Sequence, residues 1–431
     1  MRILITSHIG KEFLFMVVIS VIIAIASPIF SLFITELGHK IPNDDIVLDY
    51  ILGIVWALFL GLIILLLPIA SFYKKILVLG WIAKIFVTLG FMLFYENHYG
   101  LDSYVYYELS TEAGSALSGF EGFKSYTSNA IMIYMSKIQQ MIFDSYHATK
   151  VSFAMLGFIG ISIFYRAAVI FFEREDKNIF YFLALFPSIL FWSSILGKEP
   201  IVFLGISLYV YGVVGFYKMK RFRYLIVGGV GILVATVVRQ WLGPIMVFPM
   251  LILFFQGKTS LLSKIAVSLF VIIAIFMSAK VFMETFEIEV FQEILTVANR
   301  VNQGYVMTES GSQQELNVSL DSVDSIVKFL PFGAFTALFR PLPGEVMNLF
   351  GLLAGLESLF LILLFLLAIK RTRLMELKEP LILWAMLFTV IWALVHGIVS
   401  SANLGVAARY KLQILPVLLG LLFYLSRKRS V

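Results

Sequence analysis

Apolar residues in this chain come in long runs that are separated by short polar segments. About 20 consecutive apolar residues cross the ~30 Å hydrocarbon core of a bilayer as a helix. The pattern therefore predicts an all-α, polytopic integral membrane protein with twelve spans, at residues 13–34, 51–73, 76–95, 150–172, 179–195, 200–217, 224–238, 243–256, 264–283, 346–370, 380–398 and 408–425. The short runs at 224–238 and 243–256 could each be re-entrant or broken.

Composition agrees with this pattern and narrows the chemistry. Of the 431 residues, 60% are hydrophobic and only 14% are charged, which is less charge than a soluble protein of this size carries. The absence of cysteine excludes disulfides, thiolate metal sites and cysteine nucleophiles. The five histidines form no His-x-x-x-His pair, so no zinc site is predicted. The first apolar run has no small-residue cleavage site, and we expect it to be a retained helix.

The distribution of charge sets the expected orientation. If the N-terminus is inside, the cytoplasmic segments hold more than half of the 33 lysines and arginines but fewer than a quarter of the 27 acids. The basic runs 218–223, 370–373 and 427–429 are among them. Basic residues in short loops favour the cytoplasmic side, so both termini should be cytoplasmic. The net charge of +6 is then an orientation signal and predicts no nucleic-acid partner.

Two long outer loops, 96–149 and 284–345, complete a single transmembrane domain over residues 1–431. Within the first, residues 131–143 are too short and too polar to span and predict an amphipathic interfacial helix. Within the second, residues 326–345 are apolar but contain three prolines, which predicts a re-entrant or interfacial segment.

Polar residues from separated parts of the chain fall at the outer ends of the predicted spans. Each has an ordinary explanation, because lysine and arginine near span ends extend to the head groups and a loop aspartate can simply be solvated. Cations are disfavoured on this side, however, so their gathering points to anionic head groups or to a phosphate-bearing ligand, which the planar fork of arginine suits. The residues are Asp102, Lys198, Glu199, Arg239, Arg340, Glu345, Asn403, Arg409 and Lys411.

Two charged residues lie inside predicted spans at matched depth. Lys84 and Glu357 are each about eleven residues from the outer end of their span. Because a charge within the bilayer needs a partner or a polar cavity, we expect a structural ion pair between them. Such a pair could equally belong to a proton path.

Three stretches carry a resemblance to a known group of proteins: "FPSILFWSSILGKEP", "FRPLPGEVMNLFGLLAGLE" and "NLGVAARYKLQILP". They resemble patterns in bacterial membrane glycosyltransferases of the broad GT-C type and in O-antigen-polymerase-like proteins of surface-polysaccharide loci. Two departures stand out. Lys411 replaces a second arginine of the pattern, and Asp102 follows the third span, whereas GT-C enzymes usually carry their acid in the first outer loop. That loop holds Asp44 and Asp45 here.

The resemblance implies transfer from a polyprenyl-phosphate- or -diphosphate-linked sugar to a glycan or lipid acceptor, on the outer face of the bacterial cytoplasmic (inner) membrane. The enzyme would be a single-sugar transferase or a polymerase. Asp102 would be the base, and Glu199 would orient or neutralise Lys198. No cofactor is required, although Asp102 and Glu199 could hold a divalent cation. The phosphate would be held by Lys198, Arg239, Arg340 and Arg409, with Glu345, Asn403 and Lys411 beside them.

Two other classes fit parts of the pattern. A transporter or flippase of a lipid-linked glycan would use the same basic cavity without chemistry, but such proteins often show internal repeats, and none is visible here. A membrane scaffold without activity would leave the outer charges unexplained.

The charge pattern makes the topology testable. Reporter domains fused after Arg223 and after Arg429 should both be cytoplasmic, because each follows a basic run. Protease protection or reporter activity in intact cells measures this, and an external signal from either fusion would contradict the topology.

Overall fold

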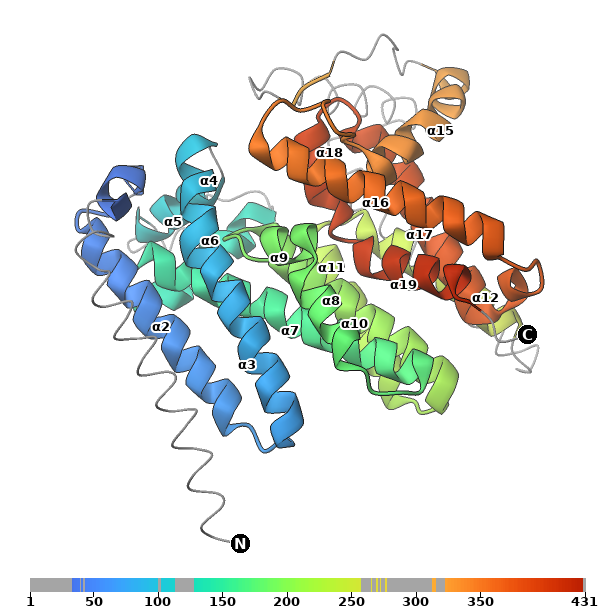
Figure 1. The fold of residues 1–431 in the computed structure, drawn as a ribbon, viewed down its shortest axis with the longest axis horizontal. Coiled ribbons are helices and arrows are strands. Elements are labelled where there is room, and N and C mark those ends of the chain that lie inside the picture. The colour runs from blue at the N-terminus through green and yellow to red at the C-terminus, as the bar shows by residue number, and fades with distance from the viewer. Residues whose placement is uncertain are drawn as a thin grey trace, which may run out of the picture.

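In the computed structural model, the described residues are 33–38, 40–41, 43–99, 102–112, 128–256, 312–314 and 322–428, together with positions 265, 269, 272 and 276. This part of the chain is helical and contains no strand (Figure 1). The N-terminal helices through α6 lie on one side of the molecule, α15 to α19 lie on the other, and α8 to α11 lie between them. The predicted all-α class is confirmed.

Among the described residues, six helices are long and apolar enough to cross a membrane. They are α2 (Ile46–Leu66), the continuous helix Ser71–His98, α7 (Tyr146–Phe172), α10 (Lys198–Met219), α16 (Leu349–Arg371) and α17 (Pro380–Ser400). A seventh is reached if α18 (Leu404–Lys411) and α19 (Leu415–Ser426) count together as one bent span. Twelve spans remain a prediction, since 13–34 and 264–283 lie almost entirely outside the described residues.

Several predicted spans are shorter or interrupted in the structure. The span at 179–195 is divided into α8 (Lys177–Leu185) and α9 (Pro187–Trp192), because Pro187 cannot continue α8 and instead begins α9. The span at 408–425 is bent by 70° between α18 and α19. The two short runs form α11 (Arg223–Val238) and α12 (Leu242–Gln256).

The segments expected at the interface are also helical. Residues 131–143 fall largely within α6 (Ser128–Gln140), which packs on α5 (Asp102–Glu112) and α7. Residues 326–345 contain most of α15 (Val323–Phe339), which packs along α17. At that contact the backbones of Gly333 and Gly397 touch, and a Cβ on Gly397 would lie 2.3 Å from a backbone carbon of Gly333.

The helix Ser71–His98 changes its pitch in the middle. It consists of α3 (Ser71–Ile85), a π-helical turn (Phe86–Phe91) and α4 (Met92–His98). In the wide turn the carbonyl of Leu89 accepts a hydrogen bond from the Tyr50 hydroxyl of α2, at 2.8 Å. A side chain thus binds a carbonyl where the regular ladder of backbone bonds is disturbed.

Beyond the π turn, α4 joins a buried polar network with α2 and α7. Glu96 accepts hydrogen bonds from the Tyr146 hydroxyl at 2.9 Å and from Lys150 Nζ at 2.7 Å. Asp49 accepts from the backbone N–H of Tyr146 at 2.7 Å and also contacts the His147 ring. All five side chains are buried. The network fixes the positions of three helices relative to one another.

The structure does not pair Lys84 with Glu357. Lys84 Nζ donates to Ser193 Oγ and to the carbonyl of Leu190, whereas Glu357 accepts from the backbone N–H of Ser188 at 2.9 Å. These two partners lie at opposite ends of α9. Helix ends leave backbone N–H and C=O groups without intrahelical partners. Each buried charged residue therefore stabilises one end of this short helix, which explains their matched depth without an ion pair.

This arrangement predicts an outcome that an ion pair would not give. We expect Lys84→Met and Glu357→Leu each to lower the free energy of unfolding by about 1–3 kcal/mol, because each leaves buried groups of α9 without a partner. Glu357→Gln should cost less, since its amide oxygen can still accept from Ser188. Unfolding in detergent would measure this. If the double variant were no less stable than either single variant, the result would support the predicted ion pair between Lys84 and Glu357.

Candidate functional site

Glu199 binds two arginines from distant parts of the chain. It lies in the first turn of α10, and its carboxylate is 2.8 Å from Nη2 of Arg239 and 2.8 Å from Nη2 of Arg409. A third contact joins Arg409 Nε to the same carboxylate at 2.7 Å. The Glu199 side chain is 1% exposed, that of Arg239 5%, and that of Arg409 21%. The site is thus a nearly closed ion cluster with one face of Arg409 accessible.

Aromatic rings surround the more buried arginine. Arg239 follows α11, and its guanidinium carbon lies 4.1 Å from the centre of the Tyr410 ring and 5.7 Å from that of Trp241. Trp241 Nε1 donates to His396 Nε2 at 3.4 Å. Rings of this kind attract a guanidinium through their negative faces. Arg239 Nε is buried and has no hydrogen-bond partner among the described residues.

The turn before α10 places Lys198 and Glu199. It runs from Ser193 to Gly197, directly after α9. Gly157 of α7 lies against it so closely that a Cβ there would be 2.2 Å from the Ser193 carbonyl oxygen. Lys198, the first residue of α10, is half-buried. Close packing on α7 and the contacts of α9 together set the position of both charged residues.

Asp102 lies near this cluster but is not part of it. It is the first residue of α5, it is exposed, and its carboxylate is 3.5 Å from the Tyr106 hydroxyl. Burial raises the pKa of Tyr106, and the charge of Asp102 raises it further, while Arg409 and Arg239 act in the opposite direction and Glu199 raises it. Tyr106 is therefore within electrostatic range of four residues that the sequence singled out.

Asn403 caps the short helix α18, which carries Arg409 of this cluster and Lys411 of a second one. It accepts from the backbone N–H groups of Gly405 at 3.0 Å and Val406 at 3.2 Å. Asn403 also accepts from Ser312 Oγ at 3.0 Å. An asparagine cap satisfies backbone donors at a helix end. The role of Asn403 in the structure is to start the helix that carries Arg409.

The second cluster is centred on Arg340. Its guanidinium binds Glu345 at 2.7 Å, and its carbonyl accepts from Lys411 Nζ at 3.0 Å. Lys411 is buried and donates also to Ser358 Oγ at 2.9 Å. Partial burial alone would raise the pKa of Glu345, but hydrogen bonds from Arg340 and from the Leu342 backbone hold it below its ordinary value. The Arg340 side chain is thus neutralised within its own turn.

The structure therefore groups the predicted residues differently from the sequence analysis. Glu199 contacts Arg239 and Arg409 rather than Lys198, and both of its oxygens are occupied. Arg340 pairs with Glu345 in a separate cluster. Asp45 caps α2 by accepting from Leu48 N at 2.9 Å. The residues described in the structure include no group of three or more histidine, aspartate and glutamate side chains arranged to hold a metal ion.

Sequence reasoning missed the aromatic part of the site. Tyr410 lies between two residues that were singled out, and Trp241 is two residues after another. His396 was signalled only by being a histidine within an apolar run. None of these signals indicates a position beside Arg239, because that position depends on how α17 and α18 pack.

Comparisons of the chain with protein-family models, with curated proteins and with solved structures found no match.

The Glu199 cluster makes a prediction for stability. Glu199→Ala leaves two guanidinium groups facing each other without a counter-charge, and we expect a loss of about 3–5 kcal/mol, as for other broken buried pairs. The control is Glu173→Ala, which removes a pair with Lys218 in which the glutamate side chain is 73% exposed. Surface pairs contribute little, so this variant should unfold like the parent. Equal effects of the two substitutions would contradict the central role of Glu199.

Proposed function

We propose that this chain is a membrane glycosyltransferase that takes its sugar from a polyprenyl-phosphate or -diphosphate carrier. The observation that supports this most strongly is the imbalance of charge around Glu199. Three cationic side chains, Lys198, Arg239 and Arg409, gather about a single buried carboxylate. Glu199 and the nearby Asp102 offset two of these charges, and the remaining positive charge suits a phosphate or diphosphate.

Arg409 is the best placed ligand for that phosphate. Its side chain keeps an accessible face while Glu199 holds its orientation, and an arginine fork can make two parallel hydrogen bonds to phosphate oxygens. Lys198 would add a second charge from the start of α10. Arg239 is too buried for direct contact and would position Arg409 through their shared carboxylate. Groups oriented in this way stabilise the charge that develops on a departing phosphate.

Asp102 is the proposed base. In the reaction, an acceptor hydroxyl forms a bond to the anomeric carbon, the bond from that carbon to the phosphate oxygen breaks, and the phosphate leaves with the electron pair. The proton of the hydroxyl passes to a base, and a positioned base contributes about 10²–10⁴-fold. Asp102 is exposed and near the cations, with Tyr106 beside it to contact the acceptor.

The Arg340 cluster would hold α18, and with it Arg409, in position. Arg340 is held by Glu345, and Lys411 binds its carbonyl, so this turn is fixed against the helix that carries Arg409. The reaction would take place at the outer surface of a bacterial cytoplasmic membrane, on a glycan or lipid acceptor. A divalent cation could join Asp102 and the phosphate there.

One observation favours a second candidate, a transporter of a lipid-linked glycan. Discontinuous helices often form the binding sites of transporters. Here the chain breaks between α8 and α9 at Phe186, and it bends by 70° between α18 and α19. The first interruption is next to Ser188, whose N–H binds Glu357, and the second follows Lys411. The two candidates differ in whether Asp102 is needed.

The test is sugar transfer by the purified protein in nanodiscs, with a radiolabelled polyprenyl-phosphate sugar and a lipid or glycan acceptor. Asp102→Asn should reduce transfer by at least about 100-fold while donor binding is kept, because the amide cannot take a proton. The matched control is Glu108→Gln, another exposed acid on α5, which should leave transfer unchanged. Arg409→Lys should weaken donor binding, since lysine lacks the fork.

The outcomes separate the candidates. Full transfer by Asp102→Asn would remove the assignment of the base. Failure of the parent protein to transfer from any polyprenyl-linked donor, combined with donor binding that depends on Arg409, would favour the transporter.

A further inference from the structure

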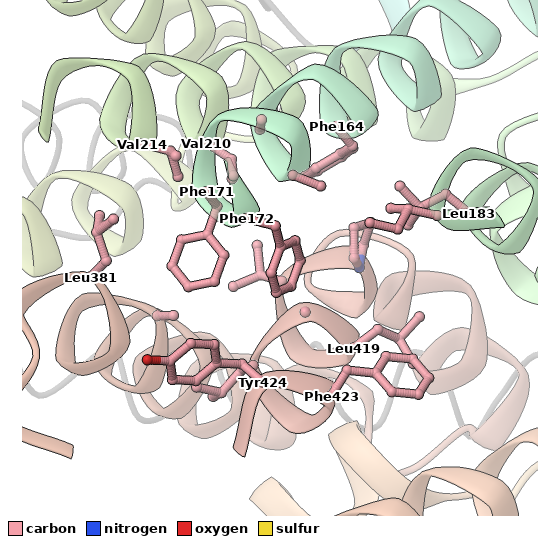
Figure 2. A pocket seen from close by; sticks show the side chains of 18 of the residues that line it. Phe164, Phe171, Phe172, Leu183, Val210, Val214, Leu381, Leu419, Phe423 and Tyr424 are labelled. Atoms are coloured by element: carbon pink, nitrogen blue, oxygen red, sulfur yellow. The ribbon is translucent and has the colours of Figure 1, made fainter. Parts of the chain in front are cut away.

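A cavity lies away from the Glu199 cluster, toward the other end of α10. It has a volume of about 730 Å³, is partly open at the surface, and is lined by α7, α8, α10, α17 and α19. Figure 2 shows Phe171 and Phe172 of α7 facing Tyr424 and Phe423 of α19 across it. Its walls are almost entirely apolar, and its volume lies within the ~300–1,000 Å³ of sites for small ligands.

Basic residues lie at one end of this cavity. Arg174, Arg427 and Lys428 line it, and no aspartate or glutamate does. These residues follow the ends of α7 and α19, where the chain leaves its apolar segments. Arg427 binds Glu376 at 2.7 Å, and Arg174 makes a looser, exposed contact with Asp176 at 3.6 Å. Lys428 makes no ion pair with the residues that the structure describes.

The cavity is separate from the Glu199 cluster. Its walls on α10 are Val210 and Val214, which lie 11 and 15 residues after Glu199. These separations correspond to about 16 and 22 Å along a helix. The cluster is at the start of α10 and the cavity lies along its second half, and the basic end of the cavity is on the side predicted to be cytoplasmic.

We propose that this cavity is a binding site for an anionic phospholipid of the bilayer. One acyl chain lies in the cavity against its aromatic walls, and the phosphate lies between Lys428 and Arg174. The combination of an apolar interior with a cationic rim matches the two parts of such a lipid, and basic residues at a membrane surface attract anionic head groups. This proposal is independent of the one made for the outer face.

A glycine allows a direct test of the interior. Gly420 of α19 lines the cavity, and a Cβ added there would meet no atom within 4 Å. Gly420→Phe therefore fills the space without displacing backbone. Gly229→Phe is the matched control, because Gly229 is also a helical glycine with open space around its Cβ but does not line the cavity. Lys428→Gln tests the rim.

The measurement is native mass spectrometry of the full chain with added phosphatidylglycerol or phosphatidylcholine. The parent and Gly229→Phe should retain phosphatidylglycerol in preference to phosphatidylcholine, and Gly420→Phe should lose this adduct. Lys428→Gln should weaken binding by about fivefold, the effect of one basic residue at a membrane surface. Unchanged adducts on Gly420→Phe, equal retention of the two phospholipids, or displacement of phosphatidylglycerol by a polyprenyl phosphate would each overturn the proposal.

Discussion

Buried guanidinium groups require a counter-charge, and at the centre of this structure one carboxylate supplies it to two of them. Glu199 contacts Arg239 at the end of α11 and Arg409 on α18, so it holds together three segments that are distant in sequence. Removing one partner of such a pair leaves a desolvated charge that the surroundings cannot solvate. Close backbone contacts such as Gly212 on Gly228 hold α10 against α11, and Glu199 ties α18 to this pair.

The position of Glu199 depends in turn on residues deeper in the chain. Lys84 and Glu357 contact opposite ends of α9, and α9 leads into the turn that begins α10. Gly157 allows α7 to touch that turn. Two buried charged residues with no catalytic assignment therefore position the first turn of α10. Polar groups inside the apolar region organise the site at its edge.

The sequence predicted the helical class and most helix positions because a run of apolar residues indicates a span directly. It failed where helices end inside a run, as at Pro187, since the run continues in composition while the helix does not. The members of the two charged clusters were singled out by their unusual place at helix ends. The partners of Glu199 were not predicted, because its contacts with Arg239 and Arg409 depend on how distant helices pack. The matched depth of Lys84 and Glu357 in the sequence correctly indicated that they act at a common region of the fold, which is α9, but it did not identify their hydrogen-bond partners.

The π turn at Phe86–Phe91 has a consequence for the face that α4 presents. A π turn is a local addition of one residue to a helix, and each residue of an α-helix advances the rotation by about 100°. The added residue thus determines the direction around the helix axis in which the side chains of α4 point, including that of Glu96. Without it, Glu96 would turn away from Lys150 and Tyr146, its partners on α7. The two halves of the helix Ser71–His98 can therefore face different neighbours. The half before the π turn directs Lys84 toward α9, and the half after it directs Glu96 toward α7.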